Sequence, residues 1–154
     1  HCDRGERQWR RIETDAFKGL AVRTIEAIPA APDSLWVGTD NGLFVSRDAG
    51  KSFTRASQPG MGMCQGIAVD PKNSSRWFVA VAAPWWTSHK NIPGIYLTVD
   101  GGVNYRRLSD MPGEGMAWRL TLDPHDGNRL YVGTNGIGAW RAVIAENGSP
   151  DTAE

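Results

Sequence analysis

The sequence predicts an all-β protein that is built from a repeated unit of four short strands. Residues 42–54 are typical of a strand, a tight turn and a second strand, and a similar stretch recurs at residues 94–105. Both carry the pattern Ser/Thr-x-Asp-x-Gly-x-(Ser/Asn)-aromatic, in which Asp and Gly are residues that favour tight turns. A second motif, Val-Gly-Thr, occurs at residues 37–39 and again at residues 132–134.

The first unit is expected over residues 25–56, after a connecting loop at residues 13–23. Its strands are short runs rich in β-branched, aromatic and other apolar residues, separated by segments rich in Gly, Pro, Asn and Asp. We predict them at residues 25–28, 34–39, 43–46 and 52–56.

The second and third units repeat this order. In the second, strands are predicted at residues 66–69, 76–81, 95–98 and 105–108, with a long insertion at residues 82–93. In the third, they are predicted at residues 118–122, 129–134 and 139–143, and no fourth strand follows. A turn that begins with Asp-Pro precedes the second strand of both units, at residues 70–73 and 123–127.

The spacing of the units is typical of the blades of a β-propeller. Their third strands open at Gly42, Gly94 and Gly138, which are 52 and 44 residues apart. Four strands in a repeat of this length match one blade. The hairpin pattern resembles the Asp-box, or BNR, repeat of propellers such as sialidases, sortilin-type receptors, xyloglucan-hydrolysing glycosidases and photosystem assembly factors. The resemblance covers residues 1–143, and residues 144–154 are expected to be a disordered polar tail.

The predicted blades form only part of a ring. The last blade lacks its outer strand, whereas residues 8–12, around Trp9 and Ile12, are predicted to be an isolated outer strand. Pairing the two would close a ring of only about three blades, and rings usually have four or more. We therefore expect another copy of the chain, or a second chain, to complete the propeller. Two copies would make six blades with two exchanged strands.

The charge of the chain limits the kinds of partner that it can bind, and its cysteines allow one disulfide. Of 154 residues, 17 are Lys or Arg and 17 are Asp or Glu, so the net charge is zero. This balance argues against nucleic acid or an anionic membrane as the partner, and no apolar run is long enough to span a membrane. Cys2 and Cys64 could form one disulfide in an oxidising compartment, or could be two buried thiols.

The residues of the hairpin pattern are expected to be structural. The resemblance implies that each Asp accepts hydrogen bonds from backbone N–H groups of its own turn, while Gly permits a positive φ and the aromatic ring packs underneath. In the related propellers these turns lie opposite the usual binding face. The residues concerned are Ser46, Asp48, Gly50, Phe53, Thr98, Asp100, Gly102 and Tyr105.

The insertion contains the candidate ligand-binding residues Trp85, Trp86 and His89. Indole rings stack on sugar rings and also anchor protein partners. The alternative is that both Trp side chains only cover the insertion or a neighbouring blade. His89 with nearby Met and Cys could bind a soft metal, but no ligand spacing supports this, so we expect no metal and no cofactor.

Two carboxylates are weak candidates for catalysis. Asp40 and Glu114 lie on the predicted binding face, and glycoside hydrolysis needs a pair of carboxylates across a cleft. No pair has a diagnostic spacing, and the arginine pattern of sialidases is absent.

We therefore favour a non-catalytic interaction or scaffold module within a larger extracellular or envelope assembly. The chain would be secreted, periplasmic or extracellular. The alternative is part of a carbohydrate-active propeller, of glycoside hydrolase type, that binds polysaccharide through Trp85 and Trp86.

Overall fold

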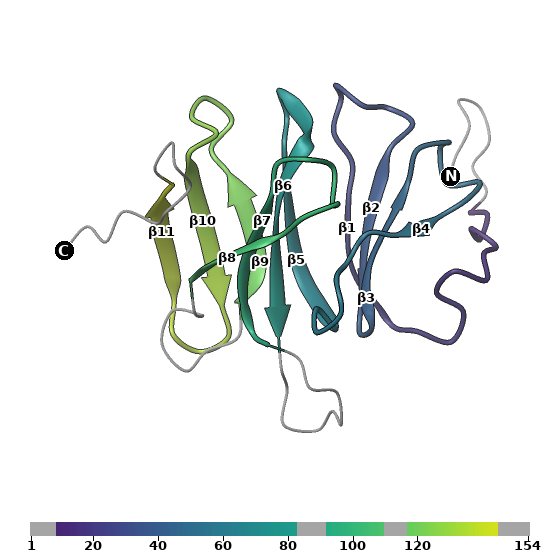
Figure 1. Cartoon of the computed structure of the whole chain (residues 1–154), viewed down its shortest axis with the longest axis horizontal. Coiled ribbons are helices and arrows are strands. Elements are labelled where there is room, and N and C mark those ends of the chain that lie inside the picture. The colour runs from purple at the N-terminus through teal and green to yellow at the C-terminus, as the bar shows by residue number, and fades with distance from the viewer. Residues whose placement is uncertain (1–8, 83–91, 110–116, 145–154) are drawn as a thin grey trace.

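The prediction of an all-β fold is confirmed. A computed structural model describes residues 9–82, 92–109 and 117–144. These residues form eleven strands and no α-helix, arranged in three antiparallel sheets (Figure 1). Within the described ranges, no helix has the length and apolar character needed to cross a membrane.

Sheet A contains the strands of the first unit in chain order. They are β1 (Val22–Glu26), β2 (Leu35–Thr39), β3 (Gly42–Ser46) and β4 (Thr54–Arg55). β1 begins three residues earlier than predicted and ends two residues earlier. The reason is its pairing with β2, which matches Val22 to Thr39 and Glu26 to Trp36. Ile28 instead lies in a turn, where its carbonyl accepts a hydrogen bond from the amide of Ala31.

Sheet B lies in the middle and contains the longest strands. They are β5 (Met63–Asp70), β6 (Asn73–Ala82), β7 (Gly94–Thr98) and β8 (Arg106–Ser109). Every residue of β5 is buried, because this strand pairs with β6 and also contacts the innermost strands β1 and β9 of the other two sheets. The prediction started β5 too late because Met63, Cys64 and Gln65 have no strand signature of their own.

Sheet C has three strands, as the sequence predicts. They are β9 (Ala117–Leu122), β10 (Arg129–Thr134) and β11 (Ala139–Val143). Residues 9–12 are in no strand of this single chain. Their predicted pairing with a last blade stays a prediction. Ile144, assigned to the tail from the sequence, is buried in the core, and its amide donates to the carbonyl of Asn128.

The three sheets stack face to face in chain order, as Figure 1 shows. One hydrophobic cluster lies between sheets A and B, where the rings of Trp36 and Trp77 meet edge to face at 5.8 Å. A second cluster lies between sheets B and C and includes Phe78, Leu120 and Leu130. Because side chains alternate along a strand, Trp77 faces sheet A and the next residue, Phe78, faces sheet C.

The strand registers show which residues of the three sheets are equivalent to one another. Trp36 pairs with Val45, Phe78 with Leu97 and Tyr131 with Arg141, so the three aromatic residues occupy equivalent positions. Trp36 and Phe78 are fully buried against the next sheet, whereas Tyr131 is 39% exposed. The outer face of sheet C is therefore the face on which a following blade would pack.

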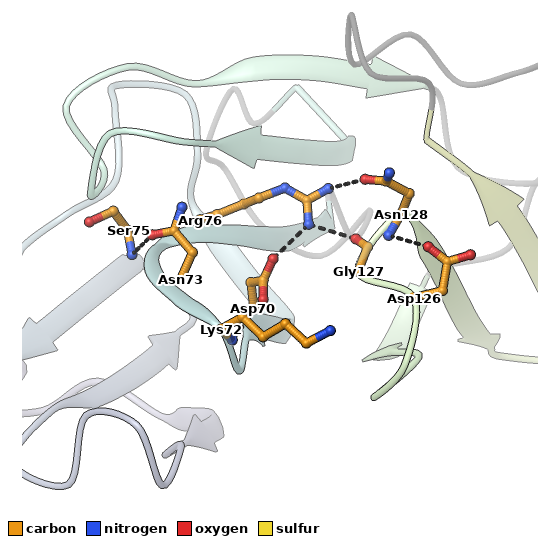
Figure 2. Close-up of polar contacts among 8 residues, drawn as sticks. All are labelled: Asp70, Lys72, Asn73, Ser75, Arg76, Asp126, Gly127 and Asn128. Atoms are coloured by element: carbon orange, nitrogen blue, oxygen red, sulfur yellow. Dashed lines mark hydrogen bonds and ion pairs between the residues drawn. The ribbon is translucent and has the colours of Figure 1, made fainter.

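A largely buried arginine of sheet B pairs with a carboxylate of its own sheet and also reaches sheet C (Figure 2). Arg76 Nη1 lies 3.0 Å from Asp70 Oδ2 and donates to the carbonyl of Gly127 at 2.6 Å, while its Nη2 donates to Asn128 Oδ1 at 3.1 Å. The guanidinium also lies 5.0 Å from the ring centre of Phe78. The side chains of Arg76 and Asp70 are only 15% and 12% exposed. We call this set of contacts the Arg76 clamp.

Removing Arg76 is expected to destabilise the chain markedly. Arg76→Ala leaves Asp70 and the carbonyl of Gly127 buried without their main partner, which costs about 2–4 kcal/mol. The measurement is urea unfolding followed by tryptophan fluorescence. Lys18→Ala is the control, because its pair with Asp15 is highly exposed and such pairs contribute less than about 1 kcal/mol. Equal losses for the two variants would contradict this role of the clamp.

Candidate functional site

Because the strands are antiparallel, the connections between them lie at two opposite ends of the sheets. The β2–β3, β6–β7 and β10–β11 connections lie at one end, together with the starts of β1, β5 and β9. We call this the loop end. The β3–β4 and β7–β8 turns, which carry the repeated Asp pattern, lie at the opposite end.

The β3–β4 turn is held by Ser46 and Asp48. Ser46 Oγ donates to Asp48 Oδ1 at 2.8 Å and accepts from the amide of Gly50 at 2.8 Å. Asp48 Oδ1 also accepts from the amide of Ser52 at 2.9 Å. Gly50 has φ of 87°, a conformation that side chains disfavour. The hydroxyl of Ser52 donates to Asp48 Oδ2 at 2.6 Å, and this bond, together with those from the Ser52 amide and the Ser46 hydroxyl, stabilises the ionised carboxylate and lowers the pKa of Asp48 to about 2.

The β7–β8 turn repeats this arrangement. Thr98 Oγ1 donates to Asp100 Oδ1 at 2.8 Å and accepts from the amide of Gly102 at 3.0 Å. The amide of Asn104 donates to Asp100 at 3.0 Å, and this bond is the main cause that lowers the pKa of Asp100 to about 2. The two turns are thus internally satisfied hydrogen-bonding units, and their carboxylates are engaged with their own turns.

The aromatic residue of each turn packs against another aromatic side chain. The ring of Phe53 meets Phe17 edge to face at 5.0 Å, and the hydroxyl of Tyr105 accepts from Trp77 Nε1 at 3.1 Å. Tyr105 therefore connects its turn to the cluster between sheets A and B, whereas Phe53 packs on the outer face of sheet A.

Asp40 lies at the loop end and ties two strands together. Its carboxylate accepts from the amide of Ala21 at 3.2 Å, and its own amide donates to the carbonyl of Ala21 at 3.1 Å. The side chain therefore holds the β2–β3 turn against the start of β1. The other candidates, Trp85, Trp86, His89 and Glu114, lie outside the described residues.

Trp118 is a loop-end residue that sequence reasoning did not single out. It is the second residue of β9 and is 52% exposed, next to a register shift between Gly133 and Thr134 of β10. The alternating apolar pattern of residues 118–122 predicts a buried Trp. The register shift turns it outward, and nothing in the local sequence marks that shift.

An apolar groove of about 320 Å³ lies on the outer face of sheet A. Val37 at its base is equivalent to Val79 and Val132, which are buried against the preceding sheet. Ile25 on the same face is 56% exposed. The groove is therefore the place where a preceding blade would pack. Its lining residues are Arg11, Ile12, Thr14, Phe17, Lys18, Gly19, Leu20, Val22, Ile25, Leu35, Val37 and Phe53.

Cys64 is a buried free thiol between sheets A and B. Burial raises its pKa to about 12, so the thiol is neutral at physiological pH. Cys2 lies outside the described residues. Within those residues, no three His, Cys, Asp or Glu side chains gather where they could hold a metal ion.

The all-β fold and the stacked antiparallel sheets define a class, the blades of a β-propeller. YCF48 from Cyanidioschyzon merolae matches with a TM-score of 0.64 and 15% identity over 92% of this chain and 38% of that chain. A GH74 xyloglucanase from Xanthomonas campestris matches with a TM-score of 0.64 and 23% identity over 87% of this chain and 20% of that chain. At these identities the likeness concerns the fold.

The sequence itself is similar to xyloglucanases. It is 30% identical over 127 residues to a probable oligoxyloglucan-reducing end-specific xyloglucanase of Neosartorya fischeri, covering 79% of this chain and 14% of that protein. It is 34% identical over 89 residues to a xyloglucanase of Acetivibrio thermocellus, covering 51% of this chain and 10% of that protein. This chain spans only a small part of the length of these relatives. No protein-family profile matches it.

The two turn carboxylates are expected to make the chain sensitive to acid. Their folded pKa of about 2 lies below the unfolded value of about 3.9, so their contribution is present above about pH 4 and is lost as the pH falls towards 2. Asp48→Asn combined with Asp100→Asn should lower the melting temperature at neutral pH and flatten its fall in acid. Circular dichroism melts across this range measure both effects.

The control for this double variant is Asp15→Asn, whose side chain is almost fully exposed. It should follow the wild-type curve. An acid dependence that is the same in the double variant and the wild type would contradict the role assigned to Asp48 and Asp100.

Proposed function

We propose that this chain supplies blades of a larger β-propeller that binds a xyloglucan-type polysaccharide outside the cell or in its envelope. The observation that supports this most is the 30% identity to a xyloglucanase over 79% of the chain. We also propose that the two hairpin turns are Asp-box turns, because both show the same Ser/Thr–Asp–Gly hydrogen bonds.

The proposed binding face is the loop end. Trp118 presents an exposed indole there, and such a ring can stack on a sugar while its N–H bonds a hydroxyl. Asp40 lies at the same end and supplies a carboxylate for sugar hydroxyls. Trp85 and Trp86 are further candidates from the sequence. The proposal is for a face with several stacking side chains rather than a closed pocket.

A non-catalytic scaffold is the second candidate, and the open outer faces of sheets A and C favour it. Both faces are equivalent to surfaces that other sheets cover inside the chain. A chain with two such faces is suited to join further blades, from another copy or a second chain. The two functions are compatible, because a ring completed in this way can also carry a polysaccharide.

Trp118→Ala is expected to weaken binding of soluble xyloglucan about five- to tenfold, which corresponds to about 1–1.4 kcal/mol of lost stacking. Affinity electrophoresis or calorimetry measures it. Trp140→Ala is the matched control, since Trp140 is in the same sheet and is 46% exposed, but lies on the outermost strand β11. No effect from Trp118→Ala would remove Trp118 from the site, and equal effects of both substitutions would show that the site is not confined to the inner strand β9.

We expect the chain to bind xyloglucan without cleaving it. Hydrolysis needs two carboxyl groups about 5–10 Å apart across the substrate, and the carboxylate of Asp40 is engaged with the amide of Ala21. The test is release of new reducing ends on prolonged incubation. Hydrolysis that Asp40→Asn abolishes would instead make Asp40 a catalytic acid and favour a hydrolase.

A further inference from the structure

The Arg76 clamp has a second copy in sheet C. Arg76 follows Asp70 by six residues and precedes Phe78 by two, and Arg129 stands in the same relation to Asp123 and Tyr131. The internal ion pair is also repeated, with Arg129 Nη1 3.3 Å from Asp123 Oδ2. The two arginines are therefore equivalent residues of successive blades.

Arg76 and Arg129 differ in what lies beyond them. Arg76 reaches the turn of the next sheet, at Gly127 and Asn128. Arg129 lies on the outer face of sheet C, and its Nη2 is 3.3 Å from Asp126 of its own turn. Its side chain is 39% exposed, against 15% for Arg76. Arg129 thus occupies the position equivalent to Arg76, but within the described residues no turn of a following sheet lies beyond it.

A turn of the required form is present at the other end of the chain, in sheet A. In sheet C the amide of Arg129 donates to the carbonyl of Asp126 at 2.9 Å, and in sheet A the amide of Ser34 donates to the carbonyl of Ala31 at 2.9 Å. By this match Pro32 corresponds to Gly127, and Asp33 corresponds to Asn128.

A second pair of hydrogen bonds supports the match of the two turns. The carbonyl of Asn128 accepts from the amide of Ile144 at 2.7 Å, and the carbonyl of Asp33 accepts from the amide of Ala49 at 2.8 Å. Both donors follow the third strand of their sheet. Pro32 and Asp33 are exposed, so a second molecule can reach their oxygen atoms.

We propose that a second copy of this chain packs the outer face of its sheet A on the outer face of sheet C. Arg129 then donates to the carbonyl of Pro32 and to the carboxylate of Asp33 of that second copy. Where the clamp within the chain uses the neutral amide of Asn128, this contact pairs opposite charges, which strengthens the hydrogen bond. The proposal rests on the scaffold role proposed above and names its partner.

Gly133 supports close packing on this face. The equivalent Gly38 is required inside the chain, because a Cβ there would lie 2.5 Å from the carbonyl oxygen of Cys64 in the next sheet. A Cβ at Gly133 would meet no atom nearer than 3.6 Å, that of Arg119 in its own sheet. The equivalent residue of sheet B is Ala80, which is buried against sheet C. A small residue therefore occupies this position in all three sheets, and at Gly133 it leaves room for a following blade.

The residues of this face also predict the strength and the salt dependence of the contact. Arg141 stands where Val45 and Leu97 are buried in the other sheets, so this face buries less apolar surface than the two contacts within the chain. A weaker, concentration-dependent association follows. Because an ion pair contributes to it, association should weaken as salt rises.

Reversing the charges of the pair tests the proposal directly. Sedimentation equilibrium of the whole chain over a concentration series should give a dimer at low salt, consistent with two symmetric contacts. Arg129→Asp alone and Asp33→Arg alone should each raise the dimer dissociation constant at least about tenfold. The double variant should return it to near the wild-type value.

Two controls separate charge from folding. Lys51→Asp changes the same charge on an exposed residue of the β3–β4 turn and should leave association unchanged. Asp33→Ala changes an exposed turn side chain and should weaken the dimer, while keeping the wild-type melting temperature at concentrations at which both chains are monomeric. A wild-type chain that is monomeric at every concentration would overturn the proposal, and so would a double variant that folds but does not recover association.

A crosslinking experiment gives a second readout. In a Cys2→Ser background, a mixture of Arg129→Cys and Asp33→Cys chains should be joined by a short bismaleimide crosslinker that spans the reach of an arginine side chain, whereas Lys51→Cys with Asp33→Cys should not. Xyloglucan binding is measured on the same charge variants. A wild-type chain that binds xyloglucan but stays monomeric overturns the dimer contact alone, and a stable dimer that binds no polysaccharide overturns the proposed ligand alone.

Discussion

The stack depends on sheet B burying both of its faces. Trp77 packs against sheet A and Phe78 against sheet C, and both are fully buried. Burial of a large side chain contributes about 1.5–3 kcal/mol, so this doubly covered sheet supplies most of the apolar contact on which sheets A and C rely. Within the described residues, each outer sheet has one covered face, and the groove on sheet A and the face around Tyr131 on sheet C lie on the other.

Polar contacts fix the relative placement of the sheets, which apolar packing alone does not determine. The Arg76 clamp pins the turn at Gly127 to the end of β5, and the guanidinium can stay largely buried because its donors meet a carboxylate, a carbonyl and an amide oxygen. Asp48 and Asp100 act differently, since each accepts hydrogen bonds from donors of its own turn. The hydrogen bonds of Asp48 and Asp100 set the local shape of each turn, whereas the Arg76 clamp sets the order of the blades.

The two candidate functions use different parts of the same architecture. The proposed polysaccharide binding would use the loop end, where Trp118 is exposed near the start of β9. The proposed assembly would use the outer faces of sheets A and C. Because the ends and the faces are separate surfaces, a propeller can join blades through one and present a ligand site on the other.

Local chemistry made much of this protein predictable. The turns around Asp48 and Asp100, the strand order and the three-stranded third sheet follow from turn residues and alternation along the chain. Tertiary structure alone decided where β1 begins, which atoms Arg76 meets 51 residues away and why Trp118 faces outward. The bounds of a strand depend on its partner strand, and the contacts of a clamp depend on the next sheet. The exposure of Trp118 depends on a register shift. None of these is encoded in the neighbouring residues, whereas a turn closes within a few residues and carries its own hydrogen-bond partners.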